Sequence, residues 1–254
     1  MPGKELTEKL RNLEAYGYDG IELGGSATLG ERLGEVKQAF SASKVRASAI
    51  CGGYPGDLLA IERDRRVQAM EGIAQRLRWA SEIGAIGVIV VPTFGQPKVP
   101  NLSPLFEDER ELEHRLLLEE LRTVGKTAED VGSKVLLEPL NRYETHFMNR
   151  LEQAAQVCDE LGSDGVKIMA DYFHMSIEEK DIVESLKRFS GLIYHVHLAD
   201  SNRLTPGNGH TDFSSLKVLR DAGYGFYLSL ECGVPADPAL ELPRTLRFLK
   251  SHLT

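Results

Sequence analysis

The 254-residue sequence is poor in cysteine and carries no excess of positive charge. Its three cysteines, Cys51, Cys158 and Cys232, are too few and too scattered for a disulfide framework or a zinc knuckle, and they suit a reducing compartment. The formal net charge of −8 argues against a surface that binds nucleic-acid phosphates. No apolar run approaches the ~20 residues of a membrane span, and the polar N-terminus shows no secretory signal. We therefore expect a soluble cytoplasmic protein that binds neither nucleic acid nor membranes.

What the sequence does contain is a recurring unit. An amphipathic helix pattern ends at a glycine, an apolar strand pattern follows, and a loop leads to the next helix. Runs such as VIVV and LLEPL are typical of strands buried on both faces, as in a parallel sheet. This alternation predicts an α/β fold, and because no linker is visible we expect residues 1–254 to form a single domain. Helices are predicted at residues 4–16, 61–83, 107–131, 150–161, 177–189, 213–222 and 239–253.

The predicted strands are one fewer than a closed (β/α)₈ barrel requires. The chain opens directly on a helix, where such a barrel would place a strand first. Three interpretations stay open at this point: a chain truncated at its start, an open barrel, or a doubly wound sheet. An open barrel would leave two strand edges unpaired. The strands are predicted at residues 20–23, 46–51, 86–92, 134–140, 166–172, 193–200 and 226–232.

Side chains that can bind metals occur at the ends of the last four predicted strands. These strands offer Glu138, then Asp171, then His195 and His197 on one face, and finally Glu231. In parallel α/β folds, ligands bind at the carboxyl ends of the strands. In a barrel, these side chains would therefore converge at one rim.

Such a cluster needs something to neutralise it. Carboxylates within ~4 Å of one another repel by about 4 kcal/mol per pair at an effective dielectric constant of ~20. Protonation would relieve part of this repulsion, because a buried carboxyl group can raise its pKa by several units. A divalent cation relieves it more completely and also uses the imidazole. Three carboxylate oxygens and one nitrogen form a mostly hard set, so we predict one bound divalent ion, Mn²⁺ or Mg²⁺, with Co²⁺ and Zn²⁺ as alternatives.

Four segments of the chain carry a family resemblance. They are EPLNRYETHFMN (138–149), ADYFHMSIEE (170–179), HVHLADSNRLTPGNGH (195–210) and SLECG (229–233). In combination they resemble the D-tagatose 3-epimerase group of the xylose-isomerase-like sugar isomerases and epimerases. The resemblance implies a (β/α)₈ TIM barrel whose first strand is absent from this chain, one divalent metal, most often Mn²⁺, and epimerisation at C3 of a free ketohexose or ketopentose. It also implies a small-molecule sugar as substrate and a homo-oligomer, dimer or tetramer.

The resemblance also assigns roles to individual positions. The family's metal ligands fall on Glu138, Asp171, His197 and Glu231. Its substrate-binding residues fall on Glu144, His174 and Arg203. Glu144 lies six residues after Glu138, His174 lies three after Asp171, and Arg203 lies six after His197. These separations match those of the family. One departure is Tyr172, which stands where the family usually has threonine and which we expect to face away from the barrel axis.

The implied reaction takes a proton from the carbon beside a ketone carbonyl and returns one to the opposite face. Two acid–base groups are needed, and Glu138 and Glu231 are the predicted pair. A metal ion would stabilise the enediolate as a Lewis acid. Of the neighbouring residues, His195 is expected to orient a ligand or to be a satisfied core residue, and Glu22 either lines the site or makes a structural hydrogen bond.

Three other functions remain open from the sequence. An aldose–ketose isomerase, similar to hydroxypyruvate or inosose isomerase, would share the same metal ligands. A DNA-repair endonuclease on the same barrel would need more histidine ligands and a basic face, whereas this chain has seven histidines and a net charge of −8. A barrel without catalytic activity is the third, because a missing strand could misplace Glu22 and Cys51.

Overall fold

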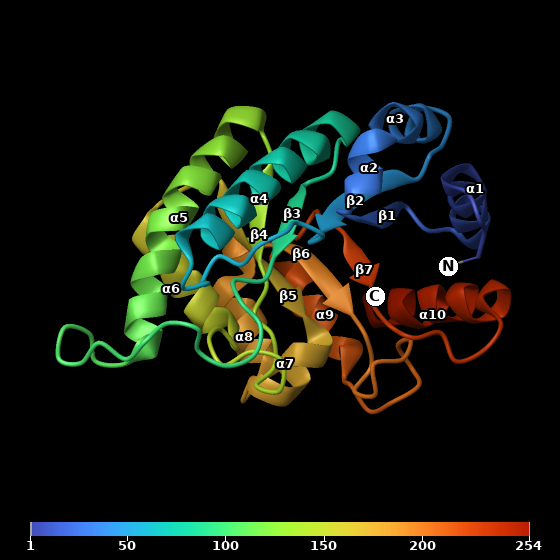
Figure 1. The fold of residues 1–254 in the computed structure, drawn as a ribbon. Coiled ribbons are helices and arrows are strands. Elements are labelled where there is room, and N and C mark those ends of the chain that lie inside the picture. The colour runs from blue at the N-terminus through green and yellow to red at the C-terminus, as the bar shows by residue number, and fades with distance from the viewer. Residues whose placement is uncertain (1, 254) are drawn as a thin grey trace.

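The computed structural model describes residues 2–253 and has one parallel β-sheet at its centre (Figure 1). The strands are β1 (Gly20–Gly24), β2 (Arg46–Cys51), β3 (Gly87–Val90), β4 (Lys134–Leu137), β5 (Val166–Asp171), β6 (Ile193–Leu198) and β7 (Leu228–Leu230). The helices are α1 (Leu6–Tyr16), α2 (Ala27–Glu31), α3 (Leu33–Ser41), α4 (Arg63–Ile83), α5 (Glu109–Val131), α6 (Leu151–Leu161), α7 (Tyr172–Glu178), α8 (Ile182–Phe189), α9 (Leu216–Asp221) and α10 (Pro238–Leu253). Short 3₁₀ turns lie at Ser190–Leu192 and Phe213–Ser215.

The strand order identifies the architecture. Within the described residues the sheet contains seven strands, whose order in space is their order in the chain. Every neighbouring pair is parallel. A doubly wound sheet would reverse its order at a switch point, and this sheet does not. The fold is therefore a nearly closed TIM barrel, with α4, α5 and α6 along one side of the strands (Figure 1), and the predicted α/β barrel with seven strands is confirmed.

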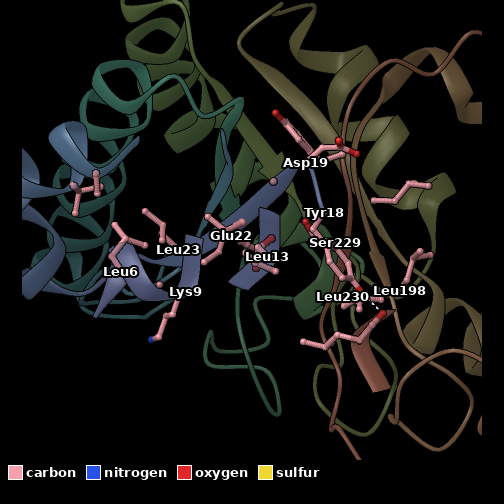
Figure 2. Close-up of a pocket in the computed structure, with 18 of the residues that line it drawn as sticks. Leu6, Lys9, Leu13, Tyr18, Asp19, Glu22, Leu23, Leu198, Ser229 and Leu230 are labelled. Atoms are coloured by element: carbon pink, nitrogen blue, oxygen red, sulfur yellow. Dashed lines mark hydrogen bonds between the residues drawn. The ribbon is translucent and has the colours of Figure 1, made fainter. Parts of the chain in front are cut away.

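The barrel is open between its first and last strands. In the part of the chain that the structure describes, β1 pairs with β2 and β7 pairs with β6, and the two do not pair with each other. A groove of about 1150 Å³ lies on this open side. Leu6, Leu13, Leu23 and Leu230 are among its lining residues (Figure 2). None of the residues predicted to bind metal or substrate lines this groove.

Helix α5 shows how the local sequence fixes an element. Its N-terminus is capped by Asp108, whose side chain accepts a hydrogen bond of 3.0 Å from the backbone N–H of Glu111. Its C-terminus is capped by Gly132 with φ of 68°, a left-handed conformation that favours glycine. Between the caps, Leu117 and Leu121 recur at helical spacing and are fully buried, so this face of the helix packs on the sheet.

The prediction of one helix over residues 177–189 is wrong. The structure has two helices, α7 and α8, in this region. Asp171 caps α7 by accepting from the backbone N–H of His174 at 3.2 Å, and Asp181 caps α8 by accepting from Glu184 at 3.0 Å. Glu179 lies between the helices and accepts a hydrogen bond from the backbone N–H of Leu151 at 2.8 Å. Two strong caps therefore divide the segment, and the short helices α2 and α3 are further elements that the sequence analysis did not predict.

No helix among residues 2–253 has both the length and the apolar character that a membrane crossing requires.

Candidate metal and substrate site

Four predicted metal ligands meet where the last four strands end. Glu138 directly follows β4, Asp171 is the last residue of β5, His197 lies in β6, and Glu231 directly follows β7. Backbone hydrogen bonds from Glu138 to β3 and from Glu231 to β6 fix both positions, at 3.1 and 3.3 Å. One oxygen or nitrogen atom of each of the four side chains lies within 4.8 Å of the corresponding atoms of the other three. The structure thus brings the predicted ligands together, and their role as ligands stays a prediction.

Two atoms of this cluster have no hydrogen-bond partner among the described residues. They are Asp171 Oδ2 and His197 Nδ1, both buried and 3.7 Å apart. His197 Nδ1 also lies 3.4 Å from Glu231 Oε2. Buried polar atoms without partners are costly, and a cation among them would remove that cost. Three carboxylates and one imidazole are ligands of the type that Mn²⁺ or Mg²⁺ accepts, so these residues fit a divalent metal site.

The electrostatics of the cluster move the pKa values of two of its carboxyl groups in opposite directions. Burial raises the pKa of Glu138 well above its usual value, and the negative charges of Asp171 and Glu231 raise it further. Burial acts in the same direction on Asp171, but the neighbouring His197 and His174 outweigh it and lower the pKa of that carboxyl. Without a cation, the cluster thus favours a protonated Glu138 beside an ionised Asp171.

Asn141, which was not predicted from the sequence, holds two of the predicted substrate-binding residues. Its backbone N–H donates to Nδ1 of His174 at 3.2 Å, and its side-chain amide donates to Oε1 of Glu144 at 2.9 Å. Because a backbone N–H can only donate, Nδ1 accepts in this contact, whereas Nε2 lies 3.3 Å from Nη1 of Arg203, which can also only donate. Nε2 also lies 3.8 Å from Oε1 of Glu138, so this side of the ring faces the cluster. The available signal was an asparagine directly after the buried run LLEPL.

Arg203 is held in an unusual backbone conformation beside the cluster. Its φ of 60° is in the left-handed region, where residues other than glycine are uncommon. Its guanidinium group lies over the ring of Phe173 at 4.5 Å, donates a hydrogen bond to Glu231, and lies 3.6 Å from Oδ2 of Asp171. Strained residues of this kind concentrate at functional sites. The position of Arg203 therefore suits a rigid donor that faces a bound molecule.

The exposed fractions show from which side a molecule would enter. The side chains of Asp171 and His197 are 0% exposed and that of Glu138 is 7% exposed. In contrast, the side chains of Arg203, Glu231 and Glu144 are 33%, 37% and 45% exposed. The predicted metal ligands thus form mainly the floor of the site, and the predicted substrate-binding residues Glu144 and Arg203 lie toward its mouth.

Glu22 reaches the cluster from β1. Its Oε2 atom accepts hydrogen bonds from Nε2 of His195 and from Nε2 of His197, each at 2.8 Å. Burial opposes ionisation, yet the two imidazoles outweigh it and lower the pKa of Glu22 to about 2. Nearby Cys51 is different, because burial raises the pKa of its thiol to about 12. It lines the site as a neutral thiol, whereas metal binding uses the thiolate.

A second network joins the loop after β3 to the loop that carries Glu144. The backbone N–H of Gly95 donates to the carbonyl of Glu144 at 2.8 Å, and that of His146 donates to the carbonyl of Gly95 at 3.0 Å. Nε2 of His146 lies 2.5 Å from Oε2 of the fully buried Glu113. Because these contacts join α5 and two loops that are distant in the sequence, no sequence pattern pointed to them.

The chain resembles known proteins over nearly its whole length. The sequence model of the family described as "Xylose isomerase-like TIM barrel" matches residues 10–252. A 3-dehydro-D-guloside 4-epimerase of Escherichia coli (strain K12) is 32% identical over 253 residues, which are 98% of this chain and 95% of the relative. A D-psicose 3-epimerase of Enterocloster bolteae is 41% identical over 105 residues, which are 41% of this chain and 35% of that protein.

A solved structure shows the same extent of similarity. The apo form of 3-keto-D-glucoside 4-epimerase from E. coli superposes with a TM-score of 0.88 at 31% sequence identity. The superposition covers 98% of this chain and 95% of that one. The similarity therefore spans the whole barrel, including all four strand ends that carry the acidic and histidine cluster.

Proposed function

This chain belongs to the xylose isomerase-like TIM barrel family, and from that premise we propose that it is a sugar epimerase that inverts a carbon atom next to a ketone carbonyl. The observation that carries the proposal is the group Glu138, Asp171, His197 and Glu231, whose ligand-type atoms lie within 4.8 Å of one another. A divalent cation held by these four residues, Mn²⁺ in the first instance, would supply Lewis-acid polarisation of the carbonyl.

Each side chain has a defined task in this proposal. Glu138 and Glu231 come from different strands, so they can approach a sugar carbon from different directions, one removing its proton and the other returning one. The carbon beside a ketone is a weak acid, so one carboxyl group must be ionised and the other protonated in each direction. Arg203 and His174 would donate hydrogen bonds to the sugar oxygens, and Glu144 would accept one from a sugar hydroxyl.

Two substrate classes fit this chemistry. In a 3-keto glycoside the ketone is C3 and the inverted carbon is C4, whereas in a free ketose the ketone is C2 and the inverted carbon is C3. The similarity to a 4-epimerase over 98% of this chain supports the first class. The 41% identity to a ketose 3-epimerase over 105 residues supports the second class, which is also the class that the sequence motifs predict. We place C4 inversion of a 3-keto glycoside first and C3 inversion of a ketohexose or ketopentose second.

Deuterium incorporation separates these reactions. With Mn²⁺ in D₂O, we expect methyl 3-keto-glucoside to gain deuterium at C4, because the returned proton comes from a group that exchanges with solvent. A free-ketose epimerase would instead label D-psicose or L-ribulose at C3, and an aldose–ketose isomerase would label C1 or C2. Proton NMR of the recovered sugars gives the position.

A matched panel completes this experiment. Each sugar is incubated with wild-type protein, with protein dialysed against EDTA, and with no protein. Deuterium that enters at the same rate without protein reports spontaneous enolisation. If no sugar of either class gained deuterium faster with the Mn²⁺-loaded protein than without it, the epimerase proposal would be wrong.

A further inference from the structure

We propose that Glu22 is a positioning residue that holds the ring of His197 so that its Nδ1 atom faces the cation. This inference rests on the proposed metal-dependent function. It concerns a residue on β1, an edge strand, that belongs neither to the predicted metal ligands nor to the predicted substrate-binding residues. The contact that carries it is the pair of hydrogen bonds that His195 and His197 both make to one oxygen of Glu22.

The hydrogen bonds decide which nitrogen of His197 is free to bind. An ionised carboxylate can only accept, so a 2.8 Å contact to Oε2 of Glu22 requires a proton on Nε2 of His197. Nδ1 of a neutral ring then keeps its lone pair. That atom is the one that lies 3.7 Å from Oδ2 of Asp171 and 3.4 Å from Oε2 of Glu231, inside the acidic cluster. A carboxylate behind a metal-binding histidine is the usual way in which proteins fix the ring and raise its basicity.

His195 makes the arrangement rigid. Its Nε2 donates to the same oxygen at 2.8 Å, and its ring lies nearly perpendicular to that of His197, at 77°. Two donors from one strand therefore fix the carboxylate in two directions. The side chain of His195 is fully buried, and that of Glu22 is 16% exposed. We infer that His195 orients Glu22, which in turn orients His197.

An irregularity in the sheet places the side chain of Glu22 beside His195 and His197. The register between β1 and β2 shifts between Ile21 and Leu23, on either side of Glu22. Such irregularities redirect a side chain and are frequent next to active sites. Glu22 also lines the groove on the open side of the barrel (Figure 2). Its contact with β6 therefore crosses the opening that β1 and β7 leave between them.

Cation affinity tests the proposal directly. We expect Glu22→Gln to raise the Kd for Mn²⁺, measured by isothermal titration calorimetry, about 10–100-fold, which is the usual loss when such a supporting carboxylate is removed. The physical reason is that glutamine carries no charge, so its amide oxygen is a weaker acceptor for the two ring N–H groups and raises the basicity of His197 less. Glu22→Asp is the second variant, because its shorter side chain keeps the charge but does not reach both rings. A loss below tenfold in both variants would overturn the proposal.

Glu113→Gln is the matched control. It makes the same chemical change in a buried glutamate that also contacts Nε2 of a histidine, His146, outside the acidic cluster. Its Kd for Mn²⁺ should equal that of the wild type. Circular dichroism and thermal melting of all three variants show that each is folded, and an equal loss of affinity in Glu113→Gln would count against a specific role of Glu22.

The NMR signals of the ring N–H protons test the positioning role of Glu22 independently of the proposed function. In the metal-free wild type, we expect slowly exchanging Nε2–H resonances from both His195 and His197 in ¹⁵N-edited NMR spectra. At least one should be lost in Glu22→Gln. A wild type that binds none of Mn²⁺, Mg²⁺, Co²⁺ and Zn²⁺ would remove the proposed metal-dependent function, and the resonances would still report on Glu22. Their persistence in the variant would overturn the positioning role.

Discussion

Replacing Glu138 or Glu231 by glutamine is expected to lower kcat by a factor of at least about 10²–10⁴, the contribution of one acid–base group. Glutamine keeps the shape of the side chain but cannot take up or release a proton at neutral pH. Each variant also removes one negative charge from the cluster whose atoms lie within 4.8 Å, so the loss should reach the upper end of this range. The measurement is the initial rate on the sugar identified by deuterium incorporation.

A two-base mechanism predicts more than a loss of rate. Each variant retains one carboxyl group, so each should still exchange the proton of one epimer with D₂O, and the two variants should prefer opposite epimers. Glu120→Gln is a suitable control, because Glu120 is a buried glutamate that pairs with Arg66 at 2.8 Å and lies on α5, away from the strand ends. Near-normal turnover in Glu138→Gln or Glu231→Gln would refute the assigned pair.

Removing divalent cations is expected to abolish activity, and adding Mn²⁺ is expected to restore it. Asp171 Oδ2 and His197 Nδ1 have no hydrogen-bond partner among the described residues, so chelation would leave two buried polar atoms unsatisfied. The melting temperature should rise again with Mn²⁺, because a cation that binds only the folded state at 100 times its Kd adds about 2.7 kcal/mol to the free energy of unfolding.

The activity restored by different divalent ions identifies the metal that the site prefers. The same protein, treated with EDTA and dialysed, is supplied with Mn²⁺, Mg²⁺, Co²⁺ or Zn²⁺, and with Ca²⁺ as a larger oxygen-preferring ion. We expect Mn²⁺ to restore the highest rate. Full activity in the chelated protein would contradict the proposed dependence on a metal, whereas restoration by another of these ions would correct only its identity.

Much of the fold and part of the site could be predicted from the sequence. The seven strands are near their predicted positions because most of them are largely apolar runs bounded by turn residues. The carboxylates of Glu138, Asp171 and Glu231 could be placed together, because the carboxyl ends of parallel strands meet at one rim. The ligand roles of these residues, the homo-oligomer and the cytoplasmic location stay predictions.

The rest depends on contacts between distant parts of the chain. The hydrogen bond between Glu22 and His195 joins residues 173 positions apart, and no local pattern encodes it. Asn141 acts through a loop conformation that places its backbone N–H on His174. A single helix was predicted over residues 177–189 because no local pattern shows that Glu179 contacts the backbone of Leu151 or that the helix begins only after Asp181.

The opening between β1 and β7 has a consequence for how this molecule fluctuates. Strands with only one hydrogen-bonded neighbour have the lowest free energy of local unfolding, so their amides should exchange with solvent fastest. Glu22 lies in β1 and Glu231 directly follows β7, and His197 contacts both carboxylates. The contacts of His197 therefore join the two sides of the opening. Binding of the cation should slow deuterium uptake in β1 and β7 more than in β3 or β4.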